Sequence, residues 1–103
     1  MKDGIIELGT PEADNFGFTA DKFFGWLWRK SEENMIIISF IESKQQGKGN
    51  VRKLIQTILD QGHNVLVPEP FLRMQEILKS MGFSSGYKNN PETGRFFVME
   101  KSC

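Results

Sequence analysis

One segment constrains the fold more than any other, because an amphipathic helical repeat lies between two apolar runs of strand length. Between residues 51 and 59, apolar residues recur at i, i+3, i+4, i+7 and i+8, which predicts a helix with one buried face. The β-branched run MIIISFI precedes this helix, and NVLVP follows it and ends at a proline. A strand, a helix and a strand in succession favour a parallel crossover, which is right-handed by strong default.

Further elements are predicted on both sides of this unit. The alternating segment FFGWLWR, residues 23–29, is interpreted as a strand antiparallel to residues 35–41, with a helix capped at Thr19 as the alternative. Residues 71–81 place apolar side chains, Phe71 among them, on one face of a second helix. Two strands around the turn NNPETG end the chain. The predicted order from residue 23 is β-β-α-β-α-β-β, an α/β fold with a mixed sheet.

The length, charge and cysteine content of the chain exclude several classes of protein. Its 103 residues suit one domain, 1–103, in which residues 1–22 form a short N-terminal extension without a firm assignment. Thirteen basic and thirteen acidic residues cancel, which disfavours nucleic acid as a partner. We expect no membrane segment, no secretion signal and a cytoplasmic protein. Because Cys103 is the only cysteine, no intrachain disulfide is possible, and no metal site is expected.

The loop between the central strand and its helix concentrates positive charge. Between Ser43 and Leu59 there are four basic residues and no acidic one. Basic residues are locally unfavourable at a helix N-terminus, which carries partial positive charge, unless an anion lies nearby. Gly47 and Gly49 allow the backbone to approach a ligand and turn its N–H groups toward it. The pattern predicts a phosphate or pyrophosphate site, with a solvated turn as the alternative. The basic residues are Lys44, Lys48, Arg52 and Lys53.

Taken in order, these segments resemble the GNAT superfamily of acyl-CoA-dependent N-acetyltransferases. The signature of that family, [QR]-x-x-G-x-[GA], lies between a strand and a helix. Residues 46–51, QGKGNV, match it at Gln46 and Gly49 and depart from it at Val51. The next helix, the strand NVLVP, the MGF at the end of the second helix and the final FFVMEK also follow the order of the family, so the resemblance covers roughly residues 23–101.

The resemblance implies a splayed sheet, in which acetyl-CoA inserts between two neighbouring strands. Its pantetheine arm would pair with the backbone at the end of the central strand, and its pyrophosphate would lie on amides of the glycine loop. Val51 either crowds the pyrophosphate or points into the core and leaves its amide usable. The implied cofactor-binding residues are Ile41, Ser43, Gln46, Gly47, Lys48, Gly49, Asn50, Val51 and Arg52. We also expect Asn50 to cap the helix.

The catalytic residues are less clearly marked. Glu42, at the end of the central strand, is the candidate general base, acting through water, and a solvent-facing carboxylate is the alternative. Many family members carry a tyrosine general acid where this chain has Leu78, so that role does not carry over. Tyr87 is the only tyrosine, and we expect it to be buried. Arg73 either reaches a phosphate or faces water.

Two further aromatic positions and the histidine complete the predictions. Trp26 and Trp28 are expected in the core, with the wall of an acceptor cleft as the alternative, and His63 is expected at the surface. Family members usually carry a strand and one or two helices before the core. Most of that part is expected to be missing here, because only 22 residues precede Phe23. The acceptor site would then be open, completed by a second subunit of a homodimer, or absent.

The resemblance therefore implies transfer of an acetyl group from acetyl-CoA to an amine of a small molecule or a protein. The alternative is a CoA-binding or protein-interaction module on the same fold without catalysis.

Overall fold

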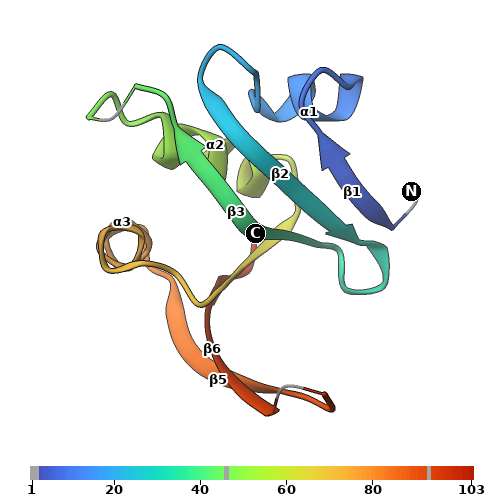
Figure 1. The fold of residues 1–103 in the computed structure, drawn as a ribbon, viewed down its shortest axis with the longest axis vertical. Helices are drawn as coiled ribbons and strands as arrows, with labels where there is room; N and C mark the ends of the chain where they lie inside the picture. The colour runs from blue at the N-terminus through green and yellow to red at the C-terminus, as the bar shows by residue number, and fades with distance from the viewer. Residues whose placement is uncertain (1–2, 46, 93) are drawn as a thin grey trace.

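A mixed sheet organises the computed structural model, which describes residues 3–45, 47–92 and 94–103. Within these residues it has six strands in the order β1-β2-β3-β4-β6-β5 (Figure 1). The elements follow one another as β1 (Gly4–Glu7), α1 (Pro11–Phe16), β2 (Phe23–Lys30), a 3₁₀ turn (Ser31–Glu33), β3 (Met35–Ser43), α2 (Asn50–Asp60), β4 (Asn64–Pro68), α3 (Leu72–Ser80), β5 (Ser84–Asn90) and β6 (Gly94–Lys101).

The predicted α/β class with a mixed sheet is confirmed, and from β2 onward the elements follow the predicted order. The parallel pair is β3 and β4, which α2 connects, and the other neighbouring strands pair antiparallel. Residues 23–30 form the strand rather than the alternative helix capped at Thr19. Aromatic residues in alternation therefore decide the conformation of this segment, as β propensity suggests.

Before Phe23, Gly4–Glu7 form a strand and Pro11–Phe16 form a short helix, so the expectation that most of a strand and one or two helices before the core would be missing is wrong. β1 pairs with β2 at the edge of the sheet. The side chain of Thr10 caps α1, Pro11 stands in its first turn, and Gly17 ends it with a φ of 78°. These residues are common signals at helix ends, but a six-residue helix has too little apolar periodicity to be recognised from its pattern alone.

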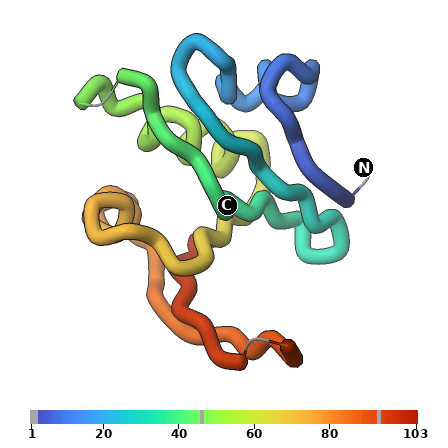
Figure 2. The backbone as a smooth tube through the Cα atoms, viewed as in Figure 1, coloured from blue at the N-terminus to red at the C-terminus, as the bar shows by residue number. Residues whose placement is uncertain are grey.

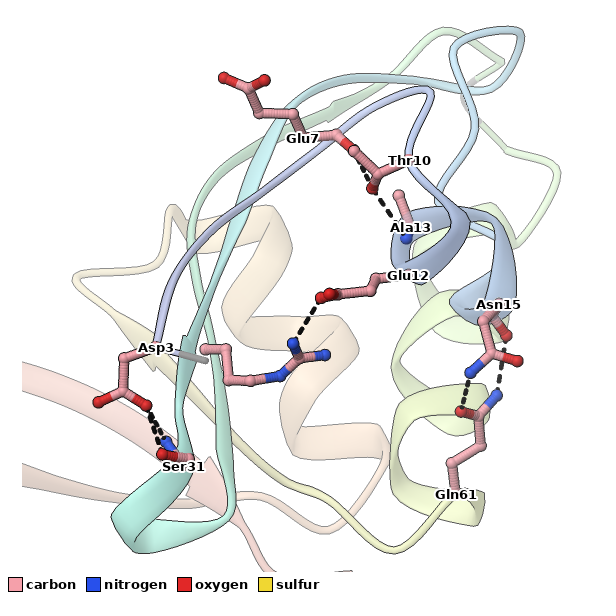
Figure 3. A network of polar contacts seen from close by, with 9 residues as sticks. Asp3, Glu7, Thr10, Glu12, Ala13, Asn15, Ser31 and Gln61 are labelled. Atoms are coloured by element: carbon pink, nitrogen blue, oxygen red, sulfur yellow. Dashed lines mark hydrogen bonds and ion pairs between the residues drawn. The ribbon is translucent and has the colours of Figure 1, made fainter. Parts of the chain in front are cut away.

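Polar contacts fasten this N-terminal unit to the rest of the chain (Figure 3). The carboxylate of Asp3 accepts hydrogen bonds from the backbone N–H of Ser31 at 2.7 Å and from its hydroxyl at 2.5 Å. These hydrogen bonds lower the pKa of Asp3, because they stabilise its charged form. The side-chain amide of Asn15 donates to Oε1 of Gln61 at 2.7 Å, and Nε2 of Gln61 donates to the backbone carbonyl of Asn15 at 2.8 Å, which joins α1 to the end of α2.

The helices and the sheet enclose a single apolar core. Strands β1 to β3 lie in front of α1 and α2 in Figure 1, and the tube in Figure 2 shows the β5–β6 hairpin extending away from them. Apolar side chains from all three helices and from strands β1 to β4 and β6 meet there. Buried core residues include Ile6, Phe16, Phe23, Leu27, Ile36, Ile38, Leu54, Ile55, Ile58, Val65, Val67, Leu78 and Met99.

His63 is buried, so its prediction as a surface residue is wrong: only 9% of it is exposed. Its Nδ1 lies 2.9 Å from Oδ1 of Asn34, whose own Nδ2 donates to the carbonyl of Gly62. Since that amide oxygen accepts, Nδ1 carries the proton and donates it. The ring also meets Phe16 edge-on at 5.6 Å. Burial, together with the nearby positive charge of Arg29, lowers the pKa of His63.

The lowered pKa of His63 predicts a loss of stability in acid. As the pH falls, His63 of the unfolded chain takes up a proton near its ordinary pKa of about 6.5, whereas His63 of the folded chain takes one up only at a lower pH. We therefore expect the free energy of unfolding to fall with falling pH, and to fall less in His63→Gln. Urea unfolding of each protein at about pH 7.5 and 5.5 measures how steeply its free energy of unfolding changes with pH. Because the chain has one histidine, the difference between the two proteins isolates it. Equal slopes would contradict this account.

The face of the sheet opposite the helices exposes aromatic side chains, which corrects the prediction for the tryptophans. Trp26 and Trp28 are 42% and 40% exposed rather than part of the core. In β2, Phe23 and Leu27 point to the core, and the alternation of the strand turns the tryptophans to the other side. We call this surface the open face; it comprises Ile5, Phe24, Trp26, Trp28 and Phe40.

Candidate functional site

The parallel pair at the centre of the sheet separates along its length. β3 and β4 pair only where residues 35–37 meet residues 64–66, although β3 continues to Ser43. Beyond Leu66, β4 continues to pair with β6 as far as Pro68 but no longer pairs with β3. The last six residues of β3 therefore present an edge to the space between the two strands.

A bulge in β3 lies where this separation begins. Trp26 pairs with Phe40 and Trp28 with Ile37, so β3 has one residue more than β2 between these pairs. Such a bulge reverses which residues face the core. Ile36 and Ile38 are buried before it, and Ile41 packs against the core after it. After the bulge, odd-numbered rather than even-numbered residues of β3 therefore face the core.

A cleft of about 710 Å³ occupies the space beside the free edge of β3. It lies between the end of β3, the loop that leads into α2, and α3, which stands across the gap from β3 in Figure 1. This volume is typical of sites for small molecules and cofactors. The cleft is lined by Phe40, Ile41, Glu42, Ser43, Gln45, Gly47, Gly49, Asn50, Val51, Arg52, Phe71, Arg73, Met74, Glu76, Ile77 and Ser80.

The N-terminus of α2 opens into this cleft. Gly49 is the N-cap, with a left-handed φ of 73°, and Asn50 is the first helical residue, so the predicted cap is one residue too late. Within the described residues, no side chain caps the helix and no acidic residue lies in its first turn. A helix start of this kind leaves backbone N–H groups available to an anion.

Asn50 adds a donor to the same site. It is only 9% exposed and lines the cleft, yet its Nδ2 has no hydrogen-bond partner among the described residues. A buried amide group without a partner costs free energy, so a ligand acceptor at this position would satisfy it. The sequence offered no sign of this, because Asn50 matched the pattern of a helix cap.

The residues predicted for the site are distributed as follows. Ile41, Glu42 and Ser43 line the cleft from β3, and the glycine loop and helix start line it from Gly47 to Arg52, with Lys48 as the exception. Lys48 is exposed. Gln46 lies outside the described residues. Val51 is half-buried and packs against the core, which is the second of the two orientations predicted for it.

Most of the residues that α3 contributes to the cleft were not predicted from the sequence. Helix α3 contributes Met74, Glu76, Ile77 and Ser80, and of this wall only Arg73 had been considered. Phe71 had been assigned to the buried face of this helix, but it precedes α3 and is 81% exposed. Phe71 fits the helical spacing of the apolar residues in α3, but the helix begins one residue later, at Leu72.

Of the three positions considered for proton transfer, Glu42, Leu78 and Tyr87, only Glu42 lines the cleft. Glu42 is exposed at the cleft and pairs across the strands with Phe24. Leu78 is fully buried in the core. Tyr87 is 61% exposed on β5, so the prediction that it is buried is wrong; β5 is an edge strand, and Arg95 stacks on the ring. Of the described residues that line the cleft, none is a tyrosine, histidine or cysteine.

In the described ranges, no three His, Cys, Asp or Glu side chains gather where they could hold a metal ion. None of the helices in the described chain is long and apolar enough to cross a membrane. Comparisons with models of protein families, with curated proteins and with solved structures find no match.

Proposed function

We propose that this chain is an acyl-CoA-dependent N-acetyltransferase of the GNAT type. One observation carries the proposal: the parallel pair β3 and β4 separates, and the gap leads to the uncapped N-terminus of α2. A free strand edge accepts an amide-containing ligand by backbone pairing, and a helix start accepts a phosphate. A pantetheine arm joined to a pyrophosphate has both features in one molecule.

In this proposal the pantetheine amides pair with the backbone of β3 from Ile41 to Ser43. The pyrophosphate lies at the start of α2, where the N–H groups of Val51 and Arg52, the side chain of Arg52 and Nδ2 of Asn50 donate to it. The half-buried side chain of Val51 supports this placement, because it points toward the core rather than toward the phosphates. The separated strands then correspond to the splayed sheet that the resemblance implies.

The reaction joins the amine nitrogen to the thioester carbonyl carbon and breaks the carbon–sulfur bond. The amine loses a proton, and the departing thiolate gains one. In the proposed reaction Glu42 receives the first proton through water, and its position in the lining of the cleft supports this role. The thiolate takes its proton from solvent, because the described cleft residues include no tyrosine, histidine or cysteine.

Acetyl-CoA binding by two matched charge variants tests the proposal. Arg52 and Lys53 both lie in the first turn of α2, but only Arg52 is among the residues that line the cleft. We expect Arg52→Ala to weaken binding about tenfold, as the loss of one charge-assisted hydrogen bond implies, and Lys53→Ala to change it little. Titration calorimetry measures both. Equal losses would indicate attraction by net charge alone, and the absence of binding to the unaltered protein would contradict the proposal.

The second candidate is a CoA-binding module without turnover. The buried Leu78, at the position where the resemblance implies a tyrosine general acid, favours it. Release of free CoA thiol from acetyl-CoA in the presence of amines separates the two candidates. Binding with amine-dependent thiol release supports the enzyme, whereas binding without it supports the module.

A further inference from the structure

The cleft opens onto the aromatic surface on the far side of the sheet. Phe40 and Glu42 line the cleft, and Phe40 also belongs to the open face. Its ring stacks on Trp26 with a centroid distance of 5.2 Å and an interplanar angle of 27°. Phe24 pairs with Glu42 across the strands and continues the surface. A ligand in the cleft can therefore lie against aromatic rings as it leaves the sheet.

This end of the open face has the chemistry of an ammonium site. The ammonium of Lys44 stands 4.3 Å from the centroid of the Phe24 ring, so that ring is already taken by a cation. The rings of Trp26 and Phe40 are the ones left for a ligand. Glu42 pairs with Phe24, and Glu7 pairs with Trp26, so both exposed carboxylates point to the side of the aromatic rings. Aromatic faces and carboxylates attract a cation together, while the rings bury the apolar part of its carrier.

We infer that this end of the open face binds the acceptor, and that the acceptor is a primary ammonium carried on an apolar body. The acceptor role rests on the proposed function. The ammonium group lies at the cleft near Glu42, and the apolar body lies on Phe40 and Trp26. A small arylalkylamine and a lysine side chain share this chemistry.

Binding of four probes to the protein without acetyl-CoA tests the site. Phenethylamine and Nα-acetyl-lysine amide represent the two sources, ethylamine lacks the apolar body, and 2-phenylethanol lacks the charge. We expect phenethylamine or the lysine derivative to bind about tenfold more tightly than either of the last two. Fluorescence titration reports binding directly, because Trp26 and Trp28 are the only tryptophans and both lie on the open face.

Matched variants locate the binding. Phe40→Leu keeps the position apolar but removes the ring, and we expect it to weaken binding about tenfold. Tyr87→Ala is the control, because Tyr87 is also an exposed aromatic residue with a cation on its ring but lies on β5, outside the cleft. Glu42→Gln should also weaken binding, and it keeps the test valid if Phe40→Leu does not fold. Equal binding of phenethylamine and 2-phenylethanol, or an equal effect of Tyr87→Ala, would overturn the inference.

Two further outcomes separate this inference from the proposed function. Acetyl-CoA binding without binding of either amine would overturn the inference alone. Amine binding without acetyl-CoA binding would overturn the proposed function and, with it, the acceptor role. Sedimentation in the absence of ligands gives a third result: a dimer that Phe40→Leu converts to monomers would show that a second copy covers this surface, which also overturns the inference.

Discussion

Gly25→Ala is expected to cost this chain a large part of its stability. Gly25 lies in β2 with a φ of 111°, where side chains with a Cβ are strained. A Cβ at this position would lie 2.2 Å from the carbonyl oxygen of Phe40 and 3.0 Å from Cα of Ile41. Both contacts are with backbone, so β3 must shift to relieve them. We expect a loss of about 3–5 kcal/mol, against the total of about 5–15 kcal/mol that is usual for a domain of this size.

Gly86→Ala is the matched control for this substitution. Gly86 also lies within a strand, but its φ is not in the left-handed region and an added Cβ would meet nothing within 4 Å. Urea unfolding of the two variants beside the unaltered protein gives the comparison. A Gly25→Ala protein as stable as Gly86→Ala would mean that β2 and β3 are not as close as described. Because Phe40 and Ile41 line the cleft, a folded Gly25→Ala protein should also bind acetyl-CoA more weakly.

The sequence predicts only part of the structural role of Gly25. A glycine inside a strand pattern suggests a bulge or a close backbone approach. The extra residue of the bulge, however, belongs to β3, in a β-branched run that shows no irregularity. The register of a strand pair depends on both strands and on the packing behind them, and neither segment contains that information alone. The strands and helices from Phe23 onward were predictable, whereas the separation of β3 from β4 was expected only from the resemblance.

In the candidate site, too, some parts could be predicted from the sequence and others could not. The loop and helix start were predictable because glycines and basic residues stand close together in the sequence. The wall from α3 was not, since Met74 and Ile77 belong to a stripe that periodicity assigns to the core. Periodicity identifies one face of a helix but does not distinguish contact with the core from contact with a cleft. For Trp26 and Trp28, the alternation likewise predicts that both side chains lie on one side of the strand. It does not indicate whether the helices cover that side or the other.

Leu78→Tyr is expected to destabilise the fold without creating a general acid. The resemblance places a tyrosine at this position, but here Leu78 is fully buried and belongs to the core cluster. The larger ring would overpack the core, at a cost of about 1–3 kcal/mol, and its buried hydroxyl would need a partner, at a cost of a further 1–3 kcal/mol. The cleft is lined instead by the neighbouring residues Ile77 and Ser80. We therefore expect a lower midpoint of unfolding and no gain in thiol release.

Leu78→Met separates packing from chemistry, because it nearly conserves volume and is expected to cost less than about 1.5 kcal/mol. If Leu78→Tyr is as stable as Leu78→Met and accelerates thiol release, the helix must turn position 78 toward the cleft during the reaction. Loss of stability with unchanged acetyl-CoA binding per folded molecule would instead place Leu78 in the core throughout. In the proposed reaction, position 78 would then play no part in protonating the departing thiolate, and the proton would come from another group at the cleft or from solvent.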